Sequence, residues 1–301
     1  MKNKYLFLMV VLLMIIALWS SKKNTTPFLE EEKDDRISVY DQEEDRIEQV
    51  LLEEYILGVV AAEMPASFHE EALKAQAIAA RSYAVYKMEH ATKDYHIIAD
   101  ISNQAYINQE QMKDKWKDEY SFYYGKVKKA VEDTKGLVMT YNDEVIEAFY
   151  FAMSNGSTED SLLVFGSSKD YLAVVDSSWD KDVNNFIVTN KISKQSFCEK
   201  LNIVCDGIKV DNINKSSSGR VNTIRINDKT FKGTEVRKLL DLRSTDFEIN
   251  ISEKIEITTK GYGHGVGMSQ YGANMMAKNG KNHEEILHHY YQNIEIVDKN
   301  V

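Results

Sequence analysis

The chain contains one strongly patterned stretch, Leu52-Glu53-Glu54-Tyr55-Ile56-Leu57-Gly58-Val59-Val60-Ala61-Ala62-Glu63-Met64-Pro65. Its apolar residues recur at helical spacing, which predicts an amphipathic helix. Pro65 disfavours helical geometry in the residue before it, so we expect the helix to end near Met64. Glu63 therefore lies at a helix C-terminus, where the helix dipole disfavours a negative charge.

Glu63 also follows a run of Val and Ala residues. Apolar surroundings raise the pKa of a carboxyl group, and a carboxyl group that is protonated near neutral pH can act as a general acid. The sequence therefore indicates Glu63 as a candidate catalytic acid. The alternative is an ordinary glutamate in a last helical turn, facing solvent.

The composition is that of a globular protein, with 43% apolar and 28% charged residues in 301 positions. The formal net charge of −10 argues against a nucleic-acid partner, because such proteins usually present a basic surface. Cys198 and Cys205 are the two cysteines, and they could be paired or free.

The N-terminus carries a targeting signal. Lysines flank an uncharged run over residues 5–21, and no small-residue cleavage site follows it. We expect an uncleaved single-pass transmembrane helix over residues 1–23, with the bulk of the chain outside the cytoplasm; a secreted mature protein is the alternative. The polar residues 24–46 are expected to form a flexible linker.

A second helix is expected after Pro65. Ser67 and Glu70 form a capping-box pattern ahead of an Ala-rich segment over residues 72–85, which carries Arg81. Two helices joined by a short turn would bring Arg81 toward the general region of Glu63.

The remaining pattern mixes strands and helices irregularly, which predicts an α+β fold and not a repeating βαβ sheet. We expect a hairpin over residues 137–153. We assign residues 47–182 and 256–301 to a catalytic core, and 183–255 to a smaller inserted α+β domain. The insert is expected to contain a strand at 221–226 and a helix at 236–240, and a strand at 255–259 is expected to follow it.

A glycine-rich turn, Gly261-Tyr262-Gly263-His264-Gly265-Val266-Gly267, displays one imidazole. It lacks the Gly-x-Gly-x-x-Gly spacing of a dinucleotide site and has no following Gly-Lys-Ser/Thr. The alternatives are a site histidine or a packed histidine in a tight turn. In the segment 283–288 the two histidines are five residues apart, so they leave the common face that a zinc-protease helix requires.

A second enzymatic alternative starts at Ser154. The segment Ala152-Met153-Ser154-Asn155-Gly156 is similar to a nucleophile elbow, and His264 could serve as its base. The residues after Gly156 are polar, unlike the helix that normally follows such an elbow.

Several separated segments resemble the stage II sporulation protein D family. They are the Glu63 segment, Ala75-Gln76-Ala77-Ile78-Ala79-Ala80-Arg81-Ser82-Tyr83, Ser154-Asn155-Gly156-Ser157-Thr158-Glu159, Ser177-Ser178-Trp179-Asp180, Ser218-Gly219-Arg220-Val221, Leu242-Arg243-Ser244-Thr245 and Gly263-His264-Gly265-Val266-Gly267-Met268-Ser269-Gln270-Tyr271-Gly272-Ala273. The resemblance extends over residues 47–298.

The resemblance implies a membrane-anchored lytic transglycosylase. Such enzymes cut the MurNAc–GlcNAc β-1,4 bond of peptide-stripped peptidoglycan during forespore engulfment and leave a 1,6-anhydro sugar. The implied partners are the glycan strands and the sporulation proteins P, an amidase, and M, a membrane protein. A related family contains amidase enhancers, so a non-catalytic peptidoglycan-binding enhancer is the alternative function.

The resemblance also implies site residues. The family's catalytic glutamate corresponds to Glu63, and its glycan-positioning residues to Arg81, Tyr171 and His264, with Ser154 and Gln270 as further candidates. Ala173 stands where some members carry a basic residue. The segment from His96 to Tyr106 has no cysteine where some members bind zinc, so we expect no structural zinc and no cofactor.

Overall fold

The computed structural model describes residues 36–42, 44–100 and 103–299, which belong to one compact unit. The expected transmembrane helix over residues 1–23 lies outside the described residues, as does the first half of the expected linker. None of the helices that the structure describes is long and apolar enough to span a membrane.

Two helices form the centre of the first part of the chain. Helix α2 (Leu52–Glu63) ends one residue before Met64, as the proline predicts. Helix α3 (Glu70–Glu89) is buried along most of its length because its many alanines allow close approach, and it packs on α2, α5 (Tyr120–Glu132), α9 (Gln270–Lys278) and α10 (His283–Tyr290).

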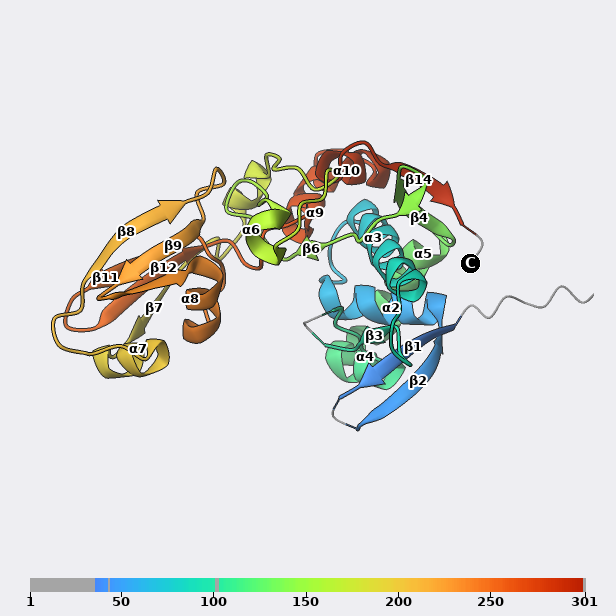
Figure 1. The fold of residues 1–301 in the computed structure, drawn as a ribbon. Coiled ribbons are helices and arrows are strands. Elements are labelled where there is room, and N and C mark those ends of the chain that lie inside the picture. The colour runs from blue at the N-terminus through green and yellow to red at the C-terminus, as the bar shows by residue number, and fades with distance from the viewer. Residues whose placement is uncertain (1–35, 43, 101–102, 300–301) are drawn as a thin grey trace, which may run out of the picture. The chain divides into compact units, whose positions relative to one another are not determined.

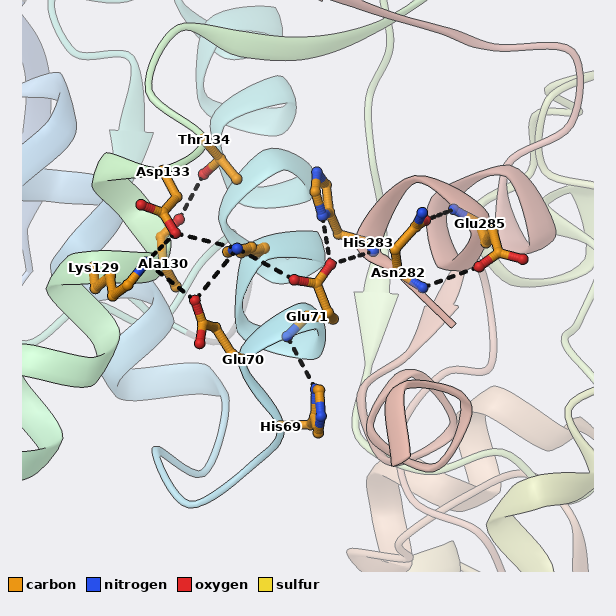
Figure 2. Close-up of polar contacts among 11 residues, drawn as sticks. His69, Glu70, Glu71, Lys129, Ala130, Asp133, Thr134, Asn282, His283 and Glu285 are labelled. Carbon is orange, nitrogen blue, oxygen red and sulfur yellow. Dashed lines mark hydrogen bonds and ion pairs between the residues drawn. The ribbon is translucent and has the colours of Figure 1, made fainter. Parts of the chain in front are cut away.

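The N-terminus of α3 differs from the expected capping box. His69, and not Ser67, is the N-cap, and its ring nitrogen Nδ1 accepts the Glu71 N–H. Glu71 in turn accepts hydrogen bonds from the backbone and the ring of His283 at the start of α10 (Figure 2). This contact joins the N-termini of α3 and α10, and α3 begins where the contact can form. The local sequence before α3 does not contain this constraint.

Short sheets surround these helices. Strand β1 (Arg36–Asp41) pairs antiparallel with β2 (Arg46–Leu51) and parallel with β3 (Ile97–Ile98). The expectation of a linker up to residue 46 is therefore wrong for residues 36–41. Ile37 and Val39 are buried there, and this burial offsets the cost of ordering a charged segment.

The expected hairpin is shorter than the sequence suggests. Strand β4 (Leu137–Tyr141) pairs with β5 (Glu144–Val145) and with β14 (Glu295–Asp298). The chain then leaves the ladder, and β6 (Tyr150–Phe151) pairs parallel with β13 (Met268–Ser269). This pairing places the glycine-rich turn beside residues 150–153.

The inserted region has its own sheets (Figure 1). Its buried apolar side chains form a cluster of their own. One sheet has the order β11-β12-β7 and the other β10-β9-β8. The strands are β7 (Ile187–Ile192), β8 (Val210–Lys215), β9 (Val221–Ile226), β10 (Lys229–Lys232), β11 (Phe247–Ile251) and β12 (Ile255–Lys260). Helices α7 (Lys194–Leu201) and α8 (Gly233–Leu240) complete it, and a disulfide joins Cys198 to Cys205.

Strand β12 crosses the expected boundary at residue 256. It pairs with β7 and β11, and its residues Ile255 and Ile257 belong to the apolar cluster of the insert. The strand at 221–226 and the helix over 236–240 are confirmed. The described part of the chain is thus a mixed α+β fold.

Smaller elements connect these parts. They are α4 (Gln109–Trp116), a 3₁₀ turn η1 (Lys117–Glu119), α6 (Ser161–Phe165) and a second 3₁₀ turn η2 (Ser178–Asp182).

Candidate active site

A cavity of about 540 Å³ contains Glu63. Eight separate parts of the chain line it. They are the end of α2, Tyr83 of α3, the segments 103–105 and 148–152, Phe165 of α6, Arg237 of α8, the glycine-rich turn at 262–264 and Gln270 of α9. Among the described residues that line it, Glu63 is the only carboxylic acid. Segments that are far apart in sequence therefore meet around one acid.

The Glu63 carboxyl group is half-buried, and its pKa is raised because burial disfavours the charged form. Three contacts oppose this effect: the Ala105 N–H, the Gln270 side chain and the positive charge of Lys115. The Ala105 N–H donates to Glu63 Oε1 at 2.8 Å. Lys115 Nζ donates to the Ala61 carbonyl at 2.7 Å, close to the last turn of α2. The group is therefore fixed in orientation and easier to protonate than an exposed glutamate.

The segment that carries Ala105 is held by Gln104. The Gln104 side chain accepts the Tyr55 hydroxyl at 3.1 Å and donates to the Ala80 carbonyl and the Tyr150 hydroxyl at 3.2 and 3.0 Å. These partners lie on α2, α3 and β6, so one buried amide fixes the segment against three elements.

Gln270 enters the cavity from the first turn of α9. Ser269 is the N-cap of this helix, and its hydroxyl donates to Asp180 at 2.9 Å. Gln270 is buried, and its amide also donates to Gln76 at 3.4 Å. The structure thus brings Gln270 to Glu63.

His264 lines the same cavity. Its Nδ1 accepts the Val266 N–H at 3.1 Å, and it also hydrogen-bonds the Tyr150 backbone. Burial, with the nearby charges of Arg237 and Arg220, lowers the pKa of His264 to about 3, so the ring is neutral at physiological pH. The ring forms part of the cavity wall beside Phe149, Phe151 and Phe165.

The glycines of the turn allow this placement. Gly265 has a φ of +91°, and a Cβ there would lie 2.7 Å from the Arg220 guanidinium carbon. Gly267 has a φ of +77°, and a Cβ there would lie 1.9 Å from the Phe149 carbonyl oxygen. Only glycine accepts both the left-handed backbone and the close approach.

Two of the expected glycan-positioning residues lie elsewhere. Arg81 is fully buried, and it donates from Nε and Nη2 to the two carboxylate oxygens of Glu53 at 2.8 and 2.7 Å. Tyr171 is 8% exposed, and its hydroxyl accepts the Glu147 N–H at 3.2 Å. Neither lines the cavity, so in this structure both residues connect elements of the protein to each other.

Ser154 is also buried away from the cavity. Its hydroxyl lies within hydrogen-bonding distance of Asp180 Oδ2 at 2.7 Å and of the Ser177 carbonyl at 2.8 Å. Among the hydrogen bonds of the described residues, none joins Ser154 to His264, whose Nδ1 is already an acceptor. This geometry gives the serine-hydrolase alternative no base.

Sequence reasoning missed several cavity residues. They are Tyr83, Asn103, Gln104, Ala105, Phe149, Phe151, Phe165, Arg237 and Tyr262. Arg237 lies in the expected helix at 236–240, where nothing local distinguishes it from a surface arginine. Gln104 lies in the segment from His96 to Tyr106, where the sequence alone does not distinguish it.

Within residues 36–42, 44–100 and 103–299, no group of three or more His, Cys, Asp or Glu side chains could hold a metal ion.

Comparison with known proteins shows the family of this chain. A family model described as "Stage II sporulation protein" matches residues 40–141, which include Glu63 and Ala105. The stage II sporulation protein D of Bacillus subtilis (strain 168) is 41% identical over 268 residues, which cover 86% of this chain and 78% of the relative. This chain belongs to the stage II sporulation protein D family.

Other relatives extend the comparison. The stage II sporulation protein D of Bacillus amyloliquefaciens shows the same identity and coverage. The protein named "Amidase enhancer" from Bacillus subtilis is 30% identical over 291 residues, which cover 78% of this chain and 39% of that longer protein. The stage II sporulation protein D family is thus related to proteins named for an effect on an amidase.

Proposed function

We propose that this protein is a lytic transglycosylase that cleaves the MurNAc–GlcNAc β-1,4 bond of peptide-stripped peptidoglycan and leaves 1,6-anhydroMurNAc. One observation carries the proposal: a half-buried glutamate with a raised pKa is the only carboxylic acid among the described residues that line the cavity.

In the proposed reaction, Glu63 first donates its proton to the glycosidic oxygen as the bond to MurNAc C1 breaks. The C6 hydroxyl of the same MurNAc then attacks C1, and Glu63 accepts the hydroxyl proton. The product is one 1,6-anhydro end and one free 4-hydroxyl end, with no water consumed. Because the nucleophile belongs to the substrate, a single carboxyl group is sufficient, whereas glycosidases that use water canonically need two.

The residues around Glu63 support this role. The Ala105 N–H and the Gln270 amide orient the carboxyl group, and they also stabilise its charged form between the two proton transfers. The aromatic wall made by Phe149, Phe151 and Phe165 offers apolar surface to the faces of sugar rings.

The wider role proposed follows the family. The chain acts at the cell membrane during engulfment in sporulation, anchored by residues 1–23 with its bulk outside the cytoplasm. Its proposed partners are the sporulation proteins P and M, of which P strips the peptides that this enzyme's substrate lacks.

The experiment uses a soluble chain that starts at residue 24 and peptide-stripped glycan strands, with mass spectrometry of the products. We expect fragments that are one water lighter than hydrolysis products, and we expect none with Glu63→Gln. Fragments at the hydrolysis mass would contradict the transglycosylase mechanism. Intact strands that remain bound would support the amidase-enhancer alternative.

A further inference from the structure

Arg237 has unused hydrogen-bonding capacity in the cavity. Its Nε donates to the Leu242 carbonyl at 3.2 Å, which fixes the base of the guanidinium group. Its terminal nitrogens have no hydrogen-bond partner among the described residues, and no carboxylate there forms an ion pair with it. These terminal nitrogens are not fully buried, so they remain accessible to a ligand.

Arg237 carries the positive charge of the cavity. The other basic side chain that lines it, among the residues described, is His264, which is neutral at physiological pH because its pKa is about 3. Burial lowers the pKa of Arg237 itself, but a guanidinium group stays charged at neutral pH. The charge of Asp241 favours the charged form of Arg237 but makes no direct ion pair with it, so an anion that binds in the cavity would stabilise this half-buried cation further.

The proposed substrate offers one such anion. Hydroxyl and acetamido groups of a glycan strand are neutral. In a strand that carries peptides, the lactyl group of MurNAc ends in an amide. Hydrolysis of this amide consumes one water, releases the peptide with an amino terminus and leaves a lactyl carboxylate. The carboxylate is therefore the anionic group that distinguishes a stripped strand from an unstripped one.

We propose that Arg237 binds the lactyl carboxylate of a peptide-stripped MurNAc and so selects stripped strands. This inference rests on the proposed function for its substrate. The fork of guanidinium donors matches the two oxygens of a carboxylate in two parallel hydrogen bonds, whereas an amide offers a single acceptor oxygen.

The test measures binding, so that it does not depend on turnover. The ligands are a peptide-free GlcNAc–MurNAc tetrasaccharide and the same tetrasaccharide with its lactyl carboxylates converted to amides. Calorimetry is carried out with Glu63→Gln protein, alone and combined with Arg237→Gln, Arg237→Lys or Lys238→Gln. Lys238 is exposed on the same helix and does not line the cavity, so it is the matched control.

We expect Arg237→Gln to weaken binding of the carboxylate ligand about tenfold and of the amide ligand less than twofold. Arg237→Lys should recover part of the loss, and Lys238→Gln should change neither affinity. Equal effects of Arg237→Gln on both ligands, or no binding of the carboxylate ligand by folded protein, would overturn the inference. Thermal melts by circular dichroism check the fold of each variant.

The experiments distinguish failure of the proposed activity from failure of this inference. If the carboxylate preference depends on Arg237 but the wild-type chain cuts no strands, the transglycosylase activity fails and the inference stands. If strands are cut but Arg237→Gln affects both ligands equally, only the inference fails.

Discussion

The backbone N–H of Ala105 donates to Glu63 Oε1 at 2.8 Å, which links a segment after β3 to the last residue of α2. The contact favours the charged carboxylate, yet burial outweighs it and the pKa of Glu63 stays raised. The site therefore combines a fixed orientation with a proton held more tightly than in an exposed glutamate. This balance suits a group that must first give a proton and then take one back.

The pH dependence of cleavage should follow Glu63. The acid must be protonated at the start, so the rate should fall as pH rises through its raised pKa. Lys115→Gln removes a positive charge that lowers this pKa, so the alkaline limb of the rate profile should move to higher pH. Rates of product formation between pH 4 and 9 measure it. Lys113→Gln, an exposed change on the same helix, should leave the limb in place; a downward shift with Lys115→Gln would contradict the assignment.

Gln104→Met should lower both stability and activity. The substitution keeps the length of the side chain but leaves the Tyr55 hydroxyl, the Ala80 carbonyl and the Tyr150 hydroxyl without their partner. We expect the free energy of unfolding to fall by about 2–4 kcal/mol in urea titrations. The exposed change Gln195→Met should cost less than about 0.5 kcal/mol. A cost that small for Gln104→Met would mean that the network contributes little.

Gly267→Ala should be strongly destabilising, because the new Cβ would lie 1.9 Å from the Phe149 carbonyl oxygen. Gly166 provides the control, since it also has a positive φ, +80°, but no atom lies within 4 Å of a Cβ placed there. We expect about 1–2 kcal/mol for Gly166→Ala from backbone strain alone, and more than about 3 kcal/mol for Gly267→Ala. Equal losses in thermal or urea unfolding would show that close approach is not the constraint.

Glu71→Gln should destabilise the protein at neutral pH. His283 and Lys74 hold the pKa of Glu71 at about 2, against the opposing effect of burial (Figure 2). The stability that comes from this lowered pKa is fully present at pH values above the ordinary pKa of a glutamate. It is lost as the pH falls toward 2. Because Glu71 is partly exposed, we expect only about 1–2 kcal/mol at pH 7.

The difference between wild type and Glu71→Gln should therefore shrink below pH 4. Chemical denaturation at pH 7 and pH 3 measures it. Glu284→Gln, an exposed change on α10, is the control and should have little effect at either pH. A penalty that grows at low pH would contradict the sign.

Asp180 should change the stability with pH in the direction opposite to that of Glu71. Burial raises its pKa to about 6, although the hydroxyls of Ser154, Ser177 and Ser269 donate to it. The stability that comes from this raised pKa is fully present at pH values below the ordinary pKa of an aspartate. It is lost as the pH rises through about 6. Between pH 4 and 7 the contribution of Asp180 should fall by about 2–3 kcal/mol.

Asp180→Asn should remove this part of the pH dependence, although the variant also loses hydrogen bonds and is less stable at pH 4. Urea unfolding at half-unit pH steps compares the two slopes. Asp182→Asn, exposed in the same η2 turn, should keep the wild-type slope. An unchanged slope in Asp180→Asn would show that Asp180 is charged throughout this range.

Sequence alone indicated Glu63 as a candidate acid and predicted the end of its helix, because both depend on neighbours within a few residues. The apolar run and Pro65 determine where α2 stops, and the strand over 221–226 follows from alternation in the same way. The alternating glycines of residues 261–267 indicated a tight turn, and their positive φ values agree with it.

The partners of Glu63 could be found only in the tertiary structure. Arg81 follows soon after Glu63 in sequence, yet the rotation of α3 directs it to Glu53, whereas Arg237 reaches the cavity from the inserted region. Strand β1 was mistaken for linker because its burial depends on β2 and β3.

The sequence by itself indicated a candidate acid, its helix and the glycine turn, since local propensity and local polarity act over one or two turns of chain. The tertiary structure decided which nitrogen donors face that carboxyl group and which cation lines the same cavity. Those contacts join segments far apart in sequence, and their geometry depends on how whole helices and sheets pack.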